Sequence, residues 1–99
     1  MSNVSKLPEL HQGYMDTLKL TQYRDDLENL TKIQEIIIKH KALQMINTKV
    51  HNLDSSFELL VGRAVIGLQI RYHWNMHNWC DTLVWRNERI SLIRICCDH

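Results

Sequence analysis

The ten residues Leu68-Gln-Ile-Arg-Tyr-His-Trp-Asn-Met-His77 alternate strictly between apolar and polar side chains. This period of two places all the apolar side chains on one face of a β-strand, whereas a helix would spread them around its circumference. The segment therefore predicts a strand with one buried and one exposed face. The segment also contains several side chains of the kinds that serve in binding or catalysis. Its geometry therefore determines which of them lie close enough to act together.

Two further β-prone segments follow this strand. The first is rich in Thr, Val and Trp, and in the second Ile90 and Leu92 alternate with Arg89 and Ser91. Residues 76–78 have the composition of a turn, and the polar residues 86–89 have the length of a hairpin loop. We expect a three-stranded antiparallel meander over about 64–76, 79–85 and 89–97.

The first half of the chain has the spacing of a helix. Apolar residues recur every three or four positions after Pro8, and the later ones form a heptad-like stripe. This pattern predicts helices over about 8–53. Ser55 and Glu58 have the spacing of a capping box, which predicts a short helix over about 56–63.

These segments indicate an α+β fold in which N-terminal helices cover one face of a small sheet, with residues 1–99 as a single domain. The last segment also fits a helix with polar positions at Asn87, Ser91, Arg94 and Asp98. An all-α helical bundle is therefore the alternative.

Composition limits the class of protein and of partner. The 44% hydrophobic and 23% charged residues are typical of a globular protein, and the net charge of +1 argues against a general nucleic-acid binder. The chain lacks an apolar run of ~18 residues and a hydrophobic signal segment at its start, so we expect a cytoplasmic protein without membrane contact. Its three cysteines fit a reducing compartment. Because so short a chain buries a limited core, we also expect a homodimer.

His73, His77 and Cys80 have the spacing H-x3-H-x2-C, which on a helix would place three zinc ligands on one face. On a straight strand the two histidines would lie roughly 13 Å apart, too far for one ion. The strand pattern thus weakens this site, and a metal-dependent sensor using these residues remains an alternative. Cys96, Cys97 and His99 form a second cluster, but adjacent cysteines on a strand point to opposite sides. We expect one of the two to pack in the core.

A nucleic-acid-binding regulator is the other alternative. Arg63, Gln69, Arg71 and His73 would line one face of the first strand, and its aromatic residues Tyr72 and Trp74 would line the other. A stacking platform for single strands needs rings and cations on the same surface. Only the arginine-rich face would then be available to phosphates.

The sequence contains no glycine-rich phosphate loop, G-x-S-x-G, H-E-x-x-H or C-x-x-C motif. It therefore predicts no catalytic residues, cofactor or metal, and instead a small cytoplasmic protein-binding protein such as an adaptor, an inhibitor or an immunity-type regulator. All five arginines and all three tryptophans of residues 55–99 lie in a segment without lysine, a composition typical of protein interfaces. The predicted partner-binding residues are Arg71, His73, His77, Trp79, Arg86 and Arg89.

Overall fold

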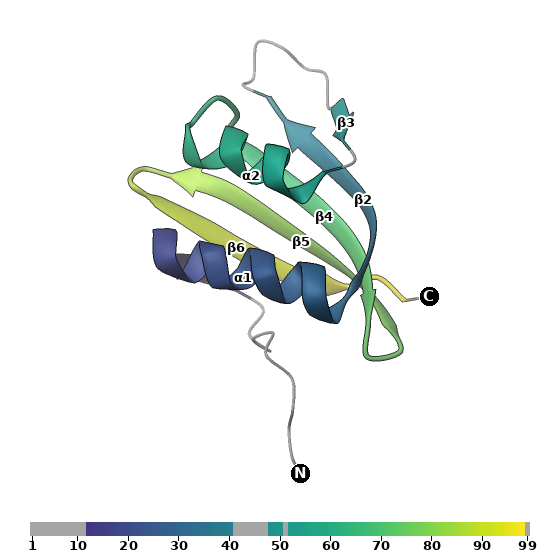
Figure 1. The fold of residues 1–99 in the computed structure, drawn as a ribbon. Helices are drawn as coiled ribbons and strands as arrows, with labels where there is room; N and C mark the ends of the chain where they lie inside the picture. The colour runs from purple at the N-terminus through teal and green to yellow at the C-terminus, as the bar shows by residue number, and fades with distance from the viewer. Residues whose placement is uncertain (1–11, 41–47, 51, 99) are drawn as a thin grey trace.

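A computed structural model of the chain describes residues 12–40, 48–50 and 52–98. They form one antiparallel six-stranded sheet in the order β1-β6-β5-β4-β2-β3, with two helices on one of its faces (Figure 1). The strands are β1 (Gln12–Met15), β2 (Lys32–Lys39), β3 (Thr48–Val50), β4 (Gly67–Trp74), β5 (His77–Arg86) and β6 (Arg89–Cys96). The helices are α1 (Thr17–Leu30) and α2 (Leu53–Val61). The α+β class is confirmed, and the all-helical alternative is wrong.

The C-terminal meander is present as β4, β5 and β6, but it is the centre of a larger sheet than the sequence predicts. The first turn lies at Asn75 and Met76, one to two residues before the predicted position, and both have positive φ (54° and 69°). Positive φ at both central residues is the conformation of a type I′ hairpin turn, whose twist matches that of the flanking strands. The second loop is shortened to Asn87 and Glu88.

The predicted helices over 8–53 are wrong for most of the described part of that range. Strand β1 precedes α1, and β2 and β3 follow it. Three consecutive isoleucines, Ile36 to Ile38, lie in β2, and β-branched side chains favour strands. The spacing of Ile33 and Ile37 resembles a helical stripe, but pairing of β2 with β4 outweighs that local pattern. Residues 8–11, 41–47 and 51 of the predicted helical range lie outside the described residues.

Each helix begins at a side-chain cap. Asp16 accepts a hydrogen bond from the backbone N–H of Lys19 at 2.8 Å, and Asn52 accepts one from Ser55 at 3.0 Å. Such caps satisfy N–H groups that have no partner within the helix. Because Asn52 is the cap, α2 begins about three residues before the start that the capping-box pattern predicts. It ends at Val61, and Arg63 after it has a positive φ of 60°.

The core lies between the helices and the sheet. Side chains of α1 and α2 pack on the face of β4 that carries Leu68, Ile70 and Tyr72, all fully buried. The neighbouring Arg71 and His73 point to the opposite side and are exposed. The predicted two-sided strand is therefore confirmed. Arg63 and Ile66 precede this strand, so they are not part of its alternating faces.

Candidate functional site

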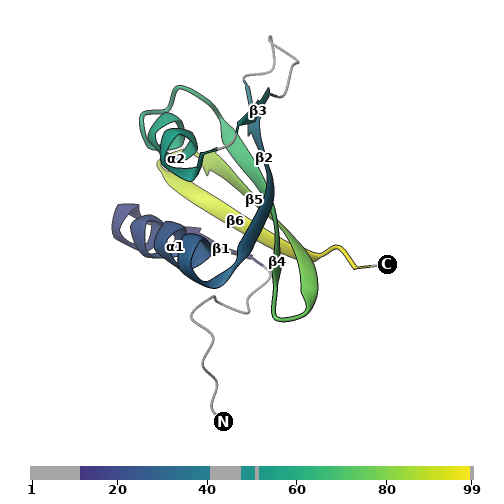
Figure 2. The same cartoon turned by 45° about the vertical axis from the view of Figure 1, so that its right-hand side comes forward.

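Within the described residues, no helix lies on the second face of the sheet, as Figure 2 shows. We call it the open face and define it by the strand residues that alternate with the core-facing ones. Strand register places the following described residues on it: Tyr14, Lys32, Glu35, Ile37, Lys39, Gln69, Arg71, His73, Cys80, Thr82, Val84, Arg86, Arg89, Ser91, Ile93 and Ile95. Four of the six predicted binding residues, Arg71, His73, Arg86 and Arg89, lie there.

The open face is cationic. Among the strand residues that define it, the charged side chains are Lys32, Lys39, Arg71, Arg86 and Arg89 against the single carboxylate Glu35. Glu35 lies 3.7 Å from Arg71, and the Arg89 guanidinium lies 5.4 Å above the Tyr14 ring. The net charge of the whole chain is only +1 because most acidic residues lie outside the open face. The net charge therefore does not reveal the local excess of positive charge.

An exposed apolar group lies beside these cations. Tyr14 of β1 is 52% exposed, and Ile93 and Ile95 of the adjacent β6 are 39% and 55% exposed. Ile93 and Ile95 are two residues apart on one strand, so their side chains are neighbours on one surface. Arginine next to aromatic and aliphatic side chains is a composition found in protein interfaces.

The other two predicted binding residues, His77 and Trp79, lie on the helix-bearing side of the sheet and not on the open face with the first four. The two-residue turn places Trp79 opposite Tyr72. Trp79 is half-buried against the core, and its indole N–H donates to the carbonyl oxygen of Trp74 at 3.1 Å. Trp79 therefore has a packing role.

The predicted metal residues are separated by the same turn. His73 lies on the open face and His77 on the helix-bearing side. Cys80 is buried beneath the open face, where its sulfur accepts a hydrogen bond from the Gln69 amide at 2.9 Å. A straight strand would have placed both histidines on one face, but residues 68–77 span a hairpin turn. The described structure thus does not gather this ligand set.

Cys96 at the end of β6 and the adjacent Cys97 point to opposite sides, but neither is buried in the core as predicted. Cys96 is exposed and Cys97 is partly exposed, whereas Cys80 is the buried cysteine. Burial, followed by the influence of Cys80, raises the pKa of the Cys97 thiol, which disfavours its thiolate. His99, the third member of that predicted cluster, lies outside the described residues.

A different cluster is present at the end of β5 and β6. The side chains of His77, Cys96 and Asp98 each offer one atom that could bind a metal ion, and these three atoms lie within 4.8 Å of one another. Asp98 accepts a hydrogen bond from the backbone N–H of Asn78 at 2.7 Å, and its other oxygen lies 2.5 Å from Nδ1 of His77. The Asn78 hydrogen bond and then His77 lower the pKa of Asp98, because both stabilise the carboxylate.

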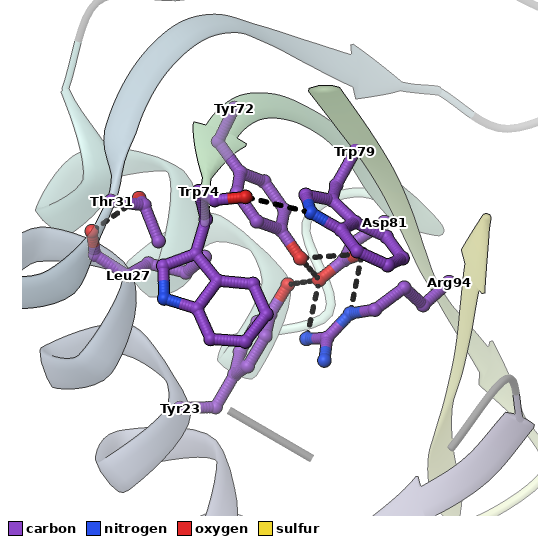
Figure 3. Close-up of polar contacts among 8 residues, drawn as sticks. All are labelled: Tyr23, Leu27, Thr31, Tyr72, Trp74, Trp79, Asp81 and Arg94. Carbon is purple, nitrogen blue, oxygen red and sulfur yellow. Dashed lines mark hydrogen bonds and ion pairs between the residues drawn. The ribbon is translucent and has the colours of Figure 1, made fainter. Parts of the chain in front are cut away.

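The core contains a polar network centred on Asp81 of β5 (Figure 3). Arg94 of β6 donates to both carboxylate oxygens, at 2.9 Å from Nε and 2.8 Å from a terminal nitrogen. The Tyr23 hydroxyl of α1 donates to Asp81 at 2.7 Å, and the Tyr72 hydroxyl of β4 donates at 2.9 Å. Asp81 and Arg94 are 0% and 2% exposed, so this is an ion pair within the core.

The protonation chemistry of this network favours a structural role. Burial, reinforced by the Asp81 carboxylate, raises the pKa of both Tyr23 and Tyr72, so both phenols remain donors at neutral pH. Burial alone would lower the pKa of Arg94, but its hydrogen bonds and charge interaction with Asp81 outweigh this effect and raise it. Tyr23, Tyr72 and Arg94 therefore keep their protons at neutral pH. Their hydrogen bonds to Asp81 join α1 to three strands.

Sequence reasoning missed this network. Its detectable signal is a charged residue at a core-facing position of each of two adjacent strands, since Asp81 and Arg94 are direct partners in the register. Tyr23 comes from a helix far away in the sequence, so only the tertiary structure shows that it belongs to this network.

A groove of about 680 Å³ lies between the helices. An ion pair of Arg24 in α1 with Asp54 in α2 joins its two sides. Leu20 and Phe57 are among its apolar lining residues, and its described lining has neither histidine nor cysteine.

Comparisons with protein-family models, with curated proteins and with solved structures found no match. Among the described residues, no helix has the length and apolar character needed to cross a membrane. Function is therefore inferred from the geometry of this chain.

Proposed function

We propose that the chain is a small cytoplasmic protein-binding protein, of the adaptor, inhibitor or immunity-type regulator class, that acts through its open face without catalysis. The observation that carries this proposal is the exposed apolar group Tyr14, Ile93 and Ile95 beside a cationic surface on which neither of the two described helices lies. Exposed apolar residues grouped on one face are typical of interaction sites.

The charge of the open face defines the partner. A face with Arg71, Arg86, Arg89 and two lysines against Glu35 alone complements a surface with carboxylates around an apolar centre. Two copies of this chain would bring like charges together if their open faces met. We therefore propose a different, acidic protein as the occupant, and place the expected homodimer contact outside the open face.

A nucleic acid is the competing partner, and the position of the rings argues against it. Tyr72 is fully buried, and Trp74 and Trp79 pack against the core, which leaves Tyr14 as the aromatic residue on the described open face. Exposed isoleucines suit a protein surface better than a phosphate backbone. Six to ten phosphate contacts would weaken binding roughly 10³–10⁵-fold between 50 and 200 mM salt.

Capture from the native host, followed by reconstitution with the purified partner, tests the proposal. We expect the variants Ile95→Glu and Arg86→Glu to weaken the affinity at least about tenfold, a loss of roughly 1.4 kcal/mol. Leu18→Glu is the matched control, since Leu18 is 69% exposed but lies on α1. The proposal fails if the control variant loses as much affinity, if the open-face variants bind normally, if no protein is captured, or if the captured component is a nucleic acid.

A further inference from the structure

The His77, Cys96 and Asp98 cluster lies where β5 begins and β6 ends, near the C-terminal end marked in Figure 1. All three side chains are exposed, so they are not part of the core. The cluster lies at the end of the sheet, apart from the open face that we assign to a protein partner. It thus calls for a separate explanation.

Strand register explains why these three residues meet. Trp79 pairs with Cys96, and the N–H of Cys97 donates to the carbonyl oxygen of Asn78 at 2.7 Å, which extends the ladder beyond Cys96. His77 therefore lies opposite Asp98, with Cys96 on the diagonal. Side chains alternate along each strand, so these three share one side and Cys97 points to the other.

The histidine and the carboxylate are already oriented. The backbone N–H of Asn78 holds one oxygen of Asp98 at 2.7 Å, and the other oxygen lies 2.5 Å from Nδ1 of His77. The His77 ring also contacts Trp79 edge to face, with centroids 6.2 Å apart. The contacts from Asn78 and Trp79 come from outside the cluster, and such supporting contacts orient metal ligands and reduce the rearrangement that binding requires.

We propose that His77, Cys96 and Asp98 bind a zinc ion. Zinc takes imidazole nitrogen, thiolate and carboxylate oxygen at about 2.0–2.3 Å in tetrahedral sites, where ligand atoms lie roughly 3.3–3.8 Å apart. Ligand atoms within 4.8 Å of one another reach that spacing by small side-chain rotations. The thiolate favours zinc over calcium or magnesium, which prefer oxygen ligands.

Binding replaces one hydrogen bond and releases protons. Nδ1 of His77 carries the proton of its hydrogen bond to Asp98, so it releases that proton to solvent when it binds the ion, and the neutral ring then carries its hydrogen on Nε2. The facing oxygen of Asp98 also turns to the ion, while Asn78 keeps its hydrogen bond to the second oxygen. The Cys96 thiol loses its proton to solvent as the sulfur–zinc bond forms. Three protein ligands leave a fourth position for water or another ligand. The sequence pattern His73, His77 and Cys80 shares only His77 with this site.

Metal titration of the full chain tests the site. The protein is purified without a histidine tag, stripped of metal, and titrated with Zn²⁺ against a chromogenic chelator and with Co²⁺ as a spectroscopic probe. We expect one equivalent of bound ion and a thiolate-to-cobalt charge-transfer band. Cys96→Ser should abolish the band. Both Cys96→Ser and His77→Gln should weaken zinc affinity at least about 100-fold, since residues that only support the ligands already contribute 10–100-fold to metal affinity.

Two matched controls use a cysteine and a histidine whose side chains point to the opposite side of the sheet: Cys97, which follows β6, and His73 of β4. Cys97→Ser and His73→Gln should retain both zinc affinity and the cobalt band. Zinc should also slow alkylation of Cys96 by iodoacetamide while leaving the rate at Cys97 unchanged. Absence of stoichiometric binding, or equal losses in Cys96→Ser and Cys97→Ser, overturns the proposal. Circular dichroism checks that each variant is folded.

Discussion

Asp81 and Arg94 are charged residues placed within an apolar core. Their pairing satisfies both groups, and in the described part of the chain every buried side-chain nitrogen or oxygen has a hydrogen-bond partner. A buried ion pair adds little stability relative to apolar residues of the same shape, but removal of one partner leaves an uncompensated charge. Tyr23 and Tyr72 extend the pair, so the four residues determine how α1 sits on the sheet.

Asp81→Asn tests this dependence on charge. We expect it to lower the free energy of unfolding by about 3–5 kcal/mol, because the Arg94 charge loses its counterion within the core. Urea denaturation measures this change. The double variant Asp81→Asn/Arg94→Met should recover part of the loss by removing the orphaned charge. A loss under 1 kcal/mol for Asp81→Asn would contradict the assigned role of the pair.

The tyrosines of the network predict a loss of stability at alkaline pH. Their folded pKa values lie above the ordinary value of 10, so their contribution is complete below pH 10. Above that pH the unfolded phenols ionise and the folded ones do not, which lowers stability by about 1.4 kcal/mol per pH unit for each tyrosine. Denaturation between pH 9 and 11.5 measures the slope, which Tyr23→Phe should reduce. An unchanged slope in that variant would be evidence against the role of Tyr23.

At the level of elements, the hairpin from β4 to β5 decides which residues share a face. Its two-residue turn reverses the chain between His73 and His77, so these histidines end on opposite sides of the sheet. The apolar–polar alternation of the sequence runs through the turn to His77, but the facing of the side chains does not: even-numbered residues of β4 and odd-numbered residues of β5 point to the core. The pattern of residues 68–77 thus revealed the strand but not its end.

Met76 offers a test of this turn. It is 86% exposed and has a φ of 69°, a conformation that is costly for a side chain and accessible to glycine. We expect Met76→Gly to increase the free energy of unfolding by up to about 1 kcal/mol, since Asn-Gly is the preferred type I′ pair. Thermal denaturation gives the comparison with Met76→Ala, which should bring no such gain. Equal effects of the two substitutions would argue against strain at this position.

At the level of the whole molecule, the two sides of the sheet have different chemistry. Two helices cover one side and bury the aromatic residues of β4 and β5, while the other side keeps cations and exposed aliphatic residues. An almost neutral chain thereby presents a locally cationic surface. That separation is the basis of the proposed protein partner, and the proposed zinc site lies outside the open face.

The sequence by itself indicated the α+β class, the three C-terminal strands and the two-sided character of β4. The strict period of two in β4 cannot be shared with a helix, whereas the last segment fitted a helix as well until its pairing with β5 made it a strand. Of the six partner-binding residues that the sequence predicted, Arg71, His73, Arg86 and Arg89 lie on the open face, and His77 and Trp79 do not. Only the tertiary structure decided that residues 32–39 are a strand, because their isoleucines fit a helical spacing until β4 supplies hydrogen-bond partners.

Tertiary structure also decided which side chains meet. Tyr23 of α1 is 58 residues from Asp81 in the sequence and donates a hydrogen bond to it. Cys96 and Asp98 lie next to His77 because β5 pairs with β6. Which side chains become neighbours depends on the strand register and on the positions of the turns. The local spacing of apolar residues predicts neither. The period of a strand assigns each side chain to a face, whereas strand pairing determines its neighbours on that face.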